Sequence, residues 1–349
     1  MPPTIAIDAM GGDRAPGAVV EGAFEAARLF ADTRILLVGR EATVKQELDR
    51  VGWTSAQAPN LEVLHAENVI DMCDSPVEAL RRKKGSSIEV ATRLVRDGSA
   101  IAMVSAGNTG ACVAAGTILL GLLPEVRRAG IAVTFRAGEL PVVVIDMGAN
   151  VSSKPEHLIQ YGIMASLYAK SVLQIERPRV GLLNIGEEDE KGNPLAKTTH
   201  ELFLKTRLNF CGNIEGNHLF RGVVDVVVCD GFVGNIVLKV SEGLAEHLLE
   251  LFKTTVEGVF GDGRAPGDTS GTAQKLQGSF GRLRERLDYS EYGGAPLLGV
   301  NGVMIIAHGR SDARAIANAI RVARRMAQEN VNKHITEEIR AVSALAQGA

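Results

Sequence analysis

The chain has 349 residues, of which 46% are hydrophobic and 23% are charged, and its net charge is −3 at pH 7. This hydrophobic share supplies a sizeable core and excludes a largely disordered chain, while scarce aromatics beside abundant glycine disfavour an aromatic-rich β-sandwich. The small negative charge gives no general electrostatic reason to bind nucleic acid.

Short apolar runs alternate with amphipathic stretches along most of the chain, which predicts a parallel sheet with helices on both faces. In chain order, the predicted strands are Ile5–Asp8, Ile35–Gly39, Leu61–His65, Ile101–Ser105, Val142–Asp146, Val180–Asn184 and Val223–Asp230. The clearest predicted helices are Ala18–Phe30, Glu156–Ser171 and Pro194–Arg207. Ile131–Phe135 and Val142–Asp146 flank a short turn and predict a hairpin, so the sheet should be mixed but mostly parallel.

The segment from about Gly234 to Asp288 departs from this alternation. It has the pattern of two long helices joined by a glycine-rich stretch at 261–268, which predicts a helical hairpin that protrudes from the sheet. A helical tail should follow from Ser311. Because no repeat or low-complexity linker interrupts the chain, we expect one α/β domain over residues 1–349, with 234–288 as an inserted arm.

The sequence carries no pattern typical of a metal centre, a secretion signal or a membrane span. The four cysteines are far apart and form no Cys-x-x-Cys pair, so neither zinc nor an iron–sulfur cluster is expected. The first residues lead directly into a predicted strand, and no apolar run approaches the roughly 20 residues of a membrane span. We expect a reduced, cytoplasmic protein, with peripheral membrane contact left open.

Polar side chains beside glycines recur where the predicted strands end. Asp8, Ser105, Asp146, Asn184 and Asp230 occupy such positions. Ligands of open α/β sheets bind beyond the carboxyl ends of the strands, so parallel strands would bring these tips to one rim. Any one loop alone is equally well explained as turn and cap chemistry. Five similar loops on one predicted edge favour a binding site.

The loop Ser105–Gly110 is the best anion site in the sequence. It follows a strand, lacks bulky side chains and leads into a helix, so its amides could hold phosphate or an oxyanion, with Asn108 as a donor. It matches neither the dinucleotide fingerprint nor the phosphate loop of nucleotide triphosphatases. This disfavours a nicotinamide or nucleotide cofactor.

Cations and one histidine are further candidates. Lys83 and Lys84 end a run of four cations that could attract phosphate or an acidic partner, although such runs are usually solvated. Lys154 could point at the rim or simply begin a helix. His308 follows an apolar run, where a structural histidine is the alternative. No nucleophile motif stands out, so a covalent acyl-enzyme is not expected.

Seven motifs together resemble the bacterial phosphate acyltransferases of phospholipid synthesis. They occur in the family's order over nearly the whole chain, and they are highly specific together although each is weak alone. They are Ile7–Asp13, Ser105–Ala111, Asp146–Asn150, Asn184–Glu188, Glu215–Asn217, Cys229–Asn235 and Glu291–Gly299.

The resemblance implies a fold and a reaction. The fold would be a three-layer α/β/α sandwich similar to the phosphate acetyltransferase and isocitrate dehydrogenase group, with no bound dinucleotide. The protein would be a homodimer that moves a long-chain acyl group from acyl carrier protein to orthophosphate without a cofactor. The acyl phosphate would pass to a membrane-bound glycerol-3-phosphate acyltransferase.

Site residues follow from the strand-tip chemistry together with this resemblance. The residues expected to be catalytic are Asn108, Lys154, Asn184 and Asp230. Those expected to bind substrate are Asp8, Gly11, Gly12, Asp13, Ser105, Gly107, Thr109, Gly110, Asp146, Asn150, Glu187, Asn217, Asn235, Lys83, Lys84 and His308. Those expected to contact the carrier protein or the membrane are Arg264, Arg282, Arg284 and Arg286. For the arm, a dimer interface with solvated arginines is the alternative.

Three other functions stay open. A phosphate acetyl- or butyryltransferase that uses coenzyme A shares the fold and chemistry, and only the resemblance disfavours it. A metal- and nicotinamide-dependent decarboxylating dehydrogenase would need a carboxylate cluster, for which Asp146, Glu187 and Asp230 are available. A non-catalytic scaffold that recruits lipid enzymes to the membrane is the third.

Overall fold

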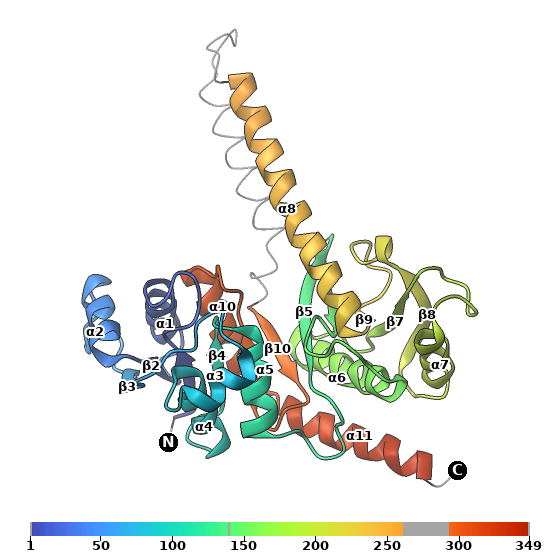
Figure 1. Cartoon of the computed structure of the whole chain (residues 1–349), viewed down its shortest axis with the longest axis horizontal. Helices are drawn as coiled ribbons and strands as arrows, with labels where there is room; N and C mark the ends of the chain where they lie inside the picture. Colours follow the sequence, from blue (N-terminus) through green and yellow to red (C-terminus); the bar gives the residue numbers. More distant parts are fainter. Residues whose placement is uncertain (1, 139, 261–292, 348–349) are drawn as a thin grey trace.

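One mixed sheet organises the residues that this computed structural model describes, which are 2–138, 140–260 and 293–347 (Figure 1). Its strands are β1 (Thr4–Asp8), β2 (Arg34–Gly39), β3 (Leu61–His65), β4 (Ala102–Ser105), β5 (Gly130–Ala137), β6 (Leu140–Ile145), β7 (Arg179–Asn184), β8 (Asn209–Glu215), β9 (Val226–Val228), β10 (Ala295–Leu298) and β11 (Val303–Ile306). They hydrogen-bond in the order β3-β2-β1-β4-β11-β10-β5-β6-β9-β7-β8.

The sheet consists of two groups of parallel strands that run in opposite directions. β3, β2, β1, β4 and β11 are parallel to one another, and so are β6, β9, β7 and β8. Between the groups, β10 is antiparallel to β11 and to β5, and β5 is antiparallel to β6. The mostly parallel sheet and the hairpin expected after Phe135 are therefore confirmed, but the strands do not all share one direction.

Helices cover both faces of the sheet and complete the expected three layers (Figure 1). One face packs against α1 (Gly17–Leu29), α2 (Glu41–Arg50), α6 (Pro155–Leu173), α7 (Pro194–Phe203), α10 (Ala313–Gln328) and α11 (Val331–Gln347). The other packs against α3 (Pro76–Arg82), α4 (Ser87–Arg96), α5 (Thr109–Ala115), a π-helical turn at Gly116–Leu120 and the start of α8 (Gly231–Phe260). A 3-10 turn at Gly216–His218 follows β8.

Strand β1 shows why the apolar runs are continuous rather than alternating. All five of its residues are buried: Ile5 and Ile7 face the first helical layer and Ala6 faces the second. A strand with helices on both sides must be apolar on both sides. The same reasoning explains β4 and β9, which are also buried throughout.

Three strands were not predicted. β8 carries Asn209 and Asn213 and lies at the edge of the sheet, so its sequence lacks the apolar run used to find strands. β10 and β11 have only four residues each, which is too short for a periodic signal. Conversely, the predicted strand Val223–Asp230 shortens to β9, because Asp225 and Asp230 bind neighbouring elements at its two ends.

Helix α8 is the first half of the expected arm. It begins at Gly231 against the sheet and extends well beyond the rest of the molecule (Figure 1). The second half of the arm lies outside the described residues, together with Arg264, Arg282, Arg284 and Arg286. Within the described ranges, no helix is both long and apolar enough to cross a membrane.

Candidate functional site

The loops after β1 and β4 are locked together by buried polar contacts. The Ser105 hydroxyl donates to Asp8 Oδ2 at 2.6 Å and accepts from the Gly107 N–H at 3.1 Å. A Cβ at Gly11 would lie 2.5 Å from Asp8 Oδ2 and 2.6 Å from Gly107 N, so only glycine permits this approach. Burial raises the pKa of Asp8, while its hydrogen bonds, that from Ser105 foremost, oppose the rise. The hydrogen bond between Asp8 and Ser105 therefore fixes the position of the loop after β1 relative to the loop after β4.

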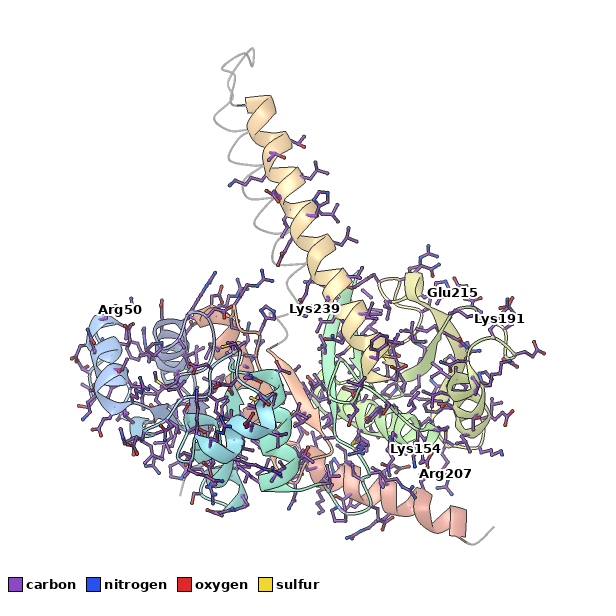
Figure 2. All side chains as sticks on the ribbon, viewed as in Figure 1. Arg50, Lys154, Lys191, Arg207, Glu215 and Lys239 are labelled. Atoms are coloured by element: carbon purple, nitrogen blue, oxygen red, sulfur yellow. The ribbon has the colours of Figure 1, made fainter. Side chains whose placement is uncertain are left out.

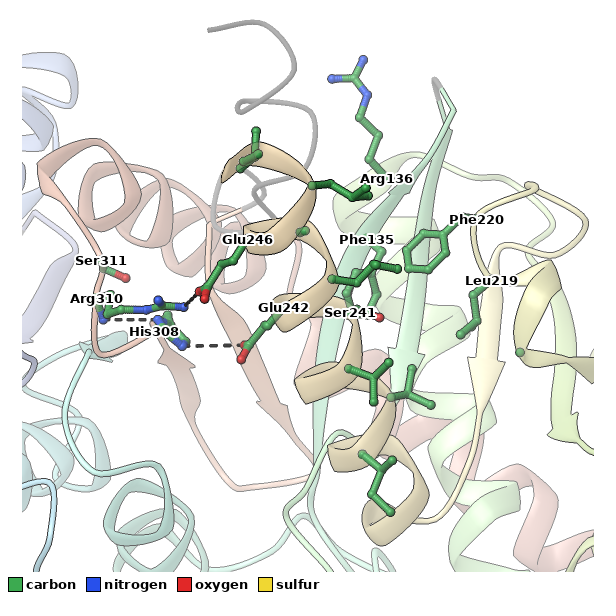
Figure 3. A pocket seen from close by; sticks show the side chains of 18 of the residues that line it. Phe135, Arg136, Leu219, Phe220, Ser241, Glu242, Glu246, His308, Arg310 and Ser311 are labelled. Carbon is green, nitrogen blue, oxygen red and sulfur yellow. Dashed lines mark hydrogen bonds and ion pairs between the residues drawn. The ribbon is translucent and has the colours of Figure 1, made fainter. Parts of the chain in front are cut away.

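The loop after β11 joins this cluster. The Asp13 N–H donates to the Gly309 carbonyl at 2.7 Å, and Gly12 packs beside the same carbonyl. His308 Nδ1 accepts the Arg310 N–H at 3.2 Å, so the neutral ring carries its proton on Nε2. That Nε2 lies 3.7 Å from Glu242 Oε1 on α8 (Figure 3). Burial lowers the pKa of His308, which favours this neutral form.

Asn108 is engaged at both ends of its amide. Its Oδ1 caps α5 by accepting the Ala111 N–H at 2.9 Å, and its Nδ2 donates to three carbonyl groups of the segment Asp71–Asp74 at 3.0 to 3.2 Å. Lys83 holds the same segment, because its ammonium lies 2.6 Å from the carboxylates of both Asp71 and Asp74. The amide expected to face an oxyanion thus anchors a neighbouring loop.

Lys84 differs from its neighbour. Its side chain is exposed, and its ammonium lies 4.0 Å from the buried carboxylate of Glu89. Of the two lysines expected to bind substrate, Lys83 therefore stabilises the segment Asp71–Asp74, and Lys84 faces solvent.

A small cavity brings the loop after β4 to the loop after β6. It measures about 340 Å³, and at one side it is lined by the first turn of α5, whose N–H groups have no partner inside the helix. We name it the α5 cavity. Its lining residues are Pro76, Val77, Thr109, Gly110, Val113, Ala114, Thr117, Ile118, Gly148 and Ala149. Thr109 and Gly110 therefore line a cavity.

Asp146 forms the frame of the loop after β6. Its Oδ1 accepts the N–H groups of Ile131, Gly148 and Ala149, and its Oδ2 accepts both the backbone and the side-chain N–H of Asn150, all at 2.9 to 3.2 Å. Burial raises the pKa of this carboxyl, and the N–H donors oppose the rise. Asp146 and Asn150 therefore shape the loop, and both carboxylate oxygens of Asp146 are already bonded to N–H donors.

The start of α8 packs directly on this loop. Asp230 Oδ1 caps the helix by accepting the N–H groups of Phe232 and Val233, each at 3.0 Å. Gly231 lies so close to Asp146 that a Cβ there would be 2.7 Å from its Oδ2. The side chain of Asn235, one turn along, lies beside Gly148. Asp230, expected to be catalytic, is a helix cap in this structure.

The loops after β7 and β8 contact each other. Asn184 turns its own loop, since its Nδ2 donates to the Lys191 carbonyl at 3.0 Å. Glu187 lies 3.2 Å from the His218 ring, and the Asn217 amide donates to the Glu215 carboxylate at 3.1 Å.

Lys154 begins α6. Its side chain is exposed and forms no ion pair with any of the described residues. In Figure 2 it is labelled at the lower right, whereas Lys239 is labelled where α8 leaves the sheet. The Lys154 ammonium therefore has no carboxylate partner in the part of the chain that the structure describes.

The expectation of one rim of parallel strand tips is wrong. β6, β7, β8 and β9 run opposite to β1, β4 and β11, because the antiparallel strands β10 and β5 intervene. The two groups nevertheless meet at the α5 cavity, which the loops after β4 and β6 both line, and along α8. This helix starts on the Asp146 loop, and eleven residues later, about 16 Å along its axis, Glu242 faces His308.

A larger cavity of about 770 Å³ lies where α8 passes the tip of β11 (Figure 3). We name it the α8 cavity. Its lining residues are Arg14, Phe135, Arg136, Gly216, Leu219, Phe220, Ile236, Val237, Val240, Ser241, Glu242, Leu244, Ala245, Glu246, Leu248, Leu249, His308, Arg310, Ser311 and Asp312. The apolar spacing of α8 was visible in the sequence. Nothing in the sequence indicated that Phe135 and Phe220 line the same cavity, because they lie on separate elements.

The described residues offer no candidate metal centre: no group of three or more histidine, cysteine, aspartate or glutamate side chains is suitably placed there. Within those same ranges, Asp146, Glu187 and Asp230 do not form the carboxylate cluster that a metal-dependent dehydrogenase would need. Both carboxylate oxygens of Asp146 accept N–H groups, and Asp230 Oδ1 caps α8.

Comparison with known proteins identifies close relatives. A family model described as "Fatty acid synthesis protein" matches residues 3–334. A phosphate acyltransferase of Pelotomaculum thermopropionicum is 49% identical over 336 residues, and one of Nitratidesulfovibrio vulgaris is 45% identical over 341 residues. Each alignment covers 96% of this chain and 94% of the relative.

Solved structures match the fold at low sequence identity. A phosphotransacetylase from Streptococcus pyogenes aligns with a TM-score of 0.60 and 17% identity over 94% of both chains. The EutD phosphotransacetylase from Staphylococcus aureus aligns with a TM-score of 0.55 and 16% identity over 93% of this chain and 94% of that one. The expected likeness to the phosphate acetyltransferase fold is confirmed.

Proposed function

Because this chain belongs to the phosphate acyltransferase family, an acyltransferase family of fatty acid synthesis, we propose that it transfers a long-chain acyl group from acyl carrier protein to orthophosphate. The product would be an acyl phosphate used for phosphatidic acid synthesis. The observation that carries this proposal is 45–49% identity to phosphate acyltransferases across 96% of the chain. The carrier protein as donor is the part of the proposal that needs direct measurement.

In the proposed reaction, a phosphate oxygen attacks the thioester carbonyl carbon and the carbonyl oxygen becomes an oxyanion. The carbon–sulfur bond then breaks, the carrier leaves as a thiolate that takes a proton from water, and acyl phosphate remains. Phosphate is already an anionic nucleophile and a thiolate leaves readily, so no covalent enzyme intermediate is needed. The protein must hold the reactants together and stabilise the oxyanion.

The first turn of α5 supports this chemistry. The N–H groups of Thr109 and Gly110 lie at the helix N-terminus beside the α5 cavity, where the helix dipole favours an anion. Asn108 acts by positioning this turn through its cap, and Asp8 with Ser105 positions the loop before it. Lys154 is exposed and could neutralise phosphate, while Asn184 and Asp230 shape neighbouring loops.

Partners and location complete the proposal. The protein works as a cytoplasmic homodimer that contacts the membrane peripherally, where its product reaches a membrane-bound glycerol-3-phosphate acyltransferase. Exposed apolar side chains along α8, such as Val240 and Leu251, support an interaction role for the arm.

A second candidate is a coenzyme A-dependent phosphate acetyl- or butyryltransferase, which the fold of the phosphotransacetylases favours. The two donors share one chemistry, so only a direct comparison separates them.

The test is to incubate purified protein with labelled phosphate and either palmitoyl-acyl carrier protein, palmitoyl-coenzyme A or butyryl-coenzyme A. We expect labelled acyl phosphate to form fastest from the carrier-protein thioester, with or without a chelator. Preference for butyryl-coenzyme A would favour the second candidate. Absence of thioester consumption from every donor would exclude an enzyme and favour a scaffold.

A further inference from the structure

One face of α5 and of the π-helical turn that follows it forms a wall of the α5 cavity. The residues of this wall recur at spacings of three and four positions, which places them on one side of the helix. They are Gly110, Val113, Ala114, Thr117 and Ile118. Ile118 lies eight positions after Gly110, so the wall is about 12 Å long. The α5 cavity is therefore elongated and follows one helix from its start.

The opposite wall of the α5 cavity is held in place by the start of α3. Pro76 and Val77 line the cavity there, and α3 packs closely on α5 (Figure 1). A Cβ at Gly110 would lie 2.5 Å from Pro76 Cγ, so only glycine permits this approach. Asn108 and Lys83 fix the segment that leads into α3. The distance between the two walls is therefore set by the fold.

The lining of the α5 cavity is largely apolar. Within the described ranges, none of the residues that line it has a charged or amide side chain, and its polar side chains are those of Thr109 and Thr117. Val77 and Ile118 are 42% and 59% exposed, so both walls present branched apolar side chains. A buried amide without a partner costs free energy, whereas a methylene chain needs no partner. The lining therefore favours a hydrocarbon chain over the pantetheine arm of a carrier, whose amides would lack side-chain partners.

The start of α5 joins the cavity to the proposed reaction site. Gly110 belongs to the loop after β4, and the loop after β6 contributes Gly148 and Ala149 to the same lining. For a carbonyl group held at the start of α5, the cavity is the adjoining apolar space. A chain attached to that carbonyl would run along Val113 towards Ile118.

We propose that the α5 cavity binds the acyl chain of the donor thioester and of the acyl phosphate, with the carbonyl group at Gly110 and the chain directed towards Ile118. This inference rests on the proposed function and adds the part of the protein that responds to chain length. An extended chain advances about 1.2 Å per bond, so a wall of about 12 Å holds roughly ten carbons. Affinity therefore rises with chain length up to about ten carbons and changes little beyond.

Replacing Ile118 tests the far end of the cavity. Leu29→Ser is the matched control for Ile118→Ser, because Leu29 is 64% exposed and lies on α1, which covers the opposite face of the sheet. We expect Ile118→Ser to lower kcat/KM about fivefold for the palmitoyl- and decanoyl-carrier protein, and less than about twofold for the butyryl form, whose chain ends before Ile118. Leu29→Ser should leave all three values unchanged.

Thr117→Phe tests the same path by filling it. Thr117 is exposed, so a ring can be accommodated without disturbing the core, and it would occupy the space through which a long chain passes. We expect kcat/KM for the palmitoyl donor to fall at least about tenfold, while the value for the butyryl donor stays within about twofold of the wild type. Thermal unfolding should show wild-type midpoints for this variant and for Ile118→Ser.

Calorimetry with alkylphosphonates, which are unreactive analogues of acyl phosphate, supplies a readout that does not depend on turnover. The wild type should bind decylphosphonate more than about tenfold more tightly than butylphosphonate, because the longer chain buries more methylenes. Ile118→Ser should weaken decylphosphonate binding about fivefold and leave butylphosphonate binding unchanged. Leu29→Ser should bind both compounds as the wild type does.

Two results would overturn the proposal. The first is an equal loss of kcat/KM at every chain length in Ile118→Ser and Thr117→Phe with unchanged decylphosphonate binding, which would place the pantetheine arm in the cavity. The second is equal affinity of the wild type for butylphosphonate and decylphosphonate. A wild type that forms no acyl phosphate from any donor, but loses decylphosphonate affinity in Ile118→Ser, would refute the proposed function and still support the cavity as a site for a hydrocarbon chain.

Discussion

Replacing Asn108 with alanine separates a positioning role from a direct role in stabilising the oxyanion. The variant removes the cap of α5, which costs about 1 kcal/mol. It also removes the amide that donates to three carbonyl groups of Asp71–Asp74. Because the amide has two N–H bonds, it makes two of these hydrogen bonds at a time, and each contributes about 1 kcal/mol. The expected loss of unfolding free energy is therefore about 3 kcal/mol.

Calorimetry and limited proteolysis measure this effect. For 349 residues with an unfolding entropy of about 2.1 cal/mol/K per residue, the loss corresponds to a fall of about 4 °C in the midpoint. Cleavage near Asp71–Asp74 should become faster. Asn193→Ala is the matched control, because Asn193 caps α7 through its bond to the Ala196 N–H at 2.9 Å and, within the described ranges, holds no second loop. It should lower the midpoint by only about 1 °C.

The opposite outcome would refute a positioning role for Asn108. If Asn108→Ala keeps the wild-type midpoint and protease resistance but turns over roughly 100-fold more slowly, the amide acts on the oxyanion itself. Its contacts to the segment Asp71–Asp74 would then have to open during the reaction.

Two further predictions concern the frame of the site. Gly231→Ala should destabilise the protein by about 1–3 kcal/mol in urea unfolding, because its Cβ would press on Asp146. Gly243→Ala on the same helix meets none of the described residues within 4 Å and should be neutral or stabilising. Equal unfolding midpoints for the two variants would contradict the packing of α8 on this loop. Asp225→Asn should destabilise by about 1–3 kcal/mol at pH 7, because Asp225 accepts two bonds from the Arg179 guanidinium, at 3.0 and 2.9 Å. Burial alone would raise the pKa of Asp225, but Arg179 lowers it overall. The difference in unfolding free energy between the wild type and Asp225→Asn should therefore be full above about pH 4 and shrink as the pH falls below it. A difference that stays constant down to about pH 2 would exclude this ion pair as the cause.

The sequence identified strand tips well because their signal is local. Asp8, Ser105 and Asn184 each end a strand, and Asp230 caps the helix that follows β9. An apolar run followed by a polar residue and glycine is visible within about ten positions of the chain. Such a pattern reports where a strand stops, and it carries no information about its direction relative to distant strands.

The direction of the strands and the roles of the tip residues depended on contacts far apart in sequence. β10 sets the reversal between the two strand groups, but its four residues give no pattern of their own. Asn108 binds carbonyl groups more than 30 positions away, and Phe135 meets Phe220 from another element. These partners are chosen by packing of the folded chain, which no local periodicity encodes.

The place of β11 in the sheet has a consequence for synthesis of the chain. β4 ends at Ser105, yet its second neighbour, β11, begins only at Val303, and the β10–β11 pair is what joins the first strand group to β5. A ribosome adds about 5–20 residues per second, so the edge of β4 stays unpaired for roughly 10–40 s before β11 is synthesised. During that interval two half-sheets carry unpaired apolar edges, which are templates for pairing with other chains. The nascent protein should therefore depend on a chaperone until β10 and β11 emerge, and truncation before β10 should yield two aggregation-prone halves.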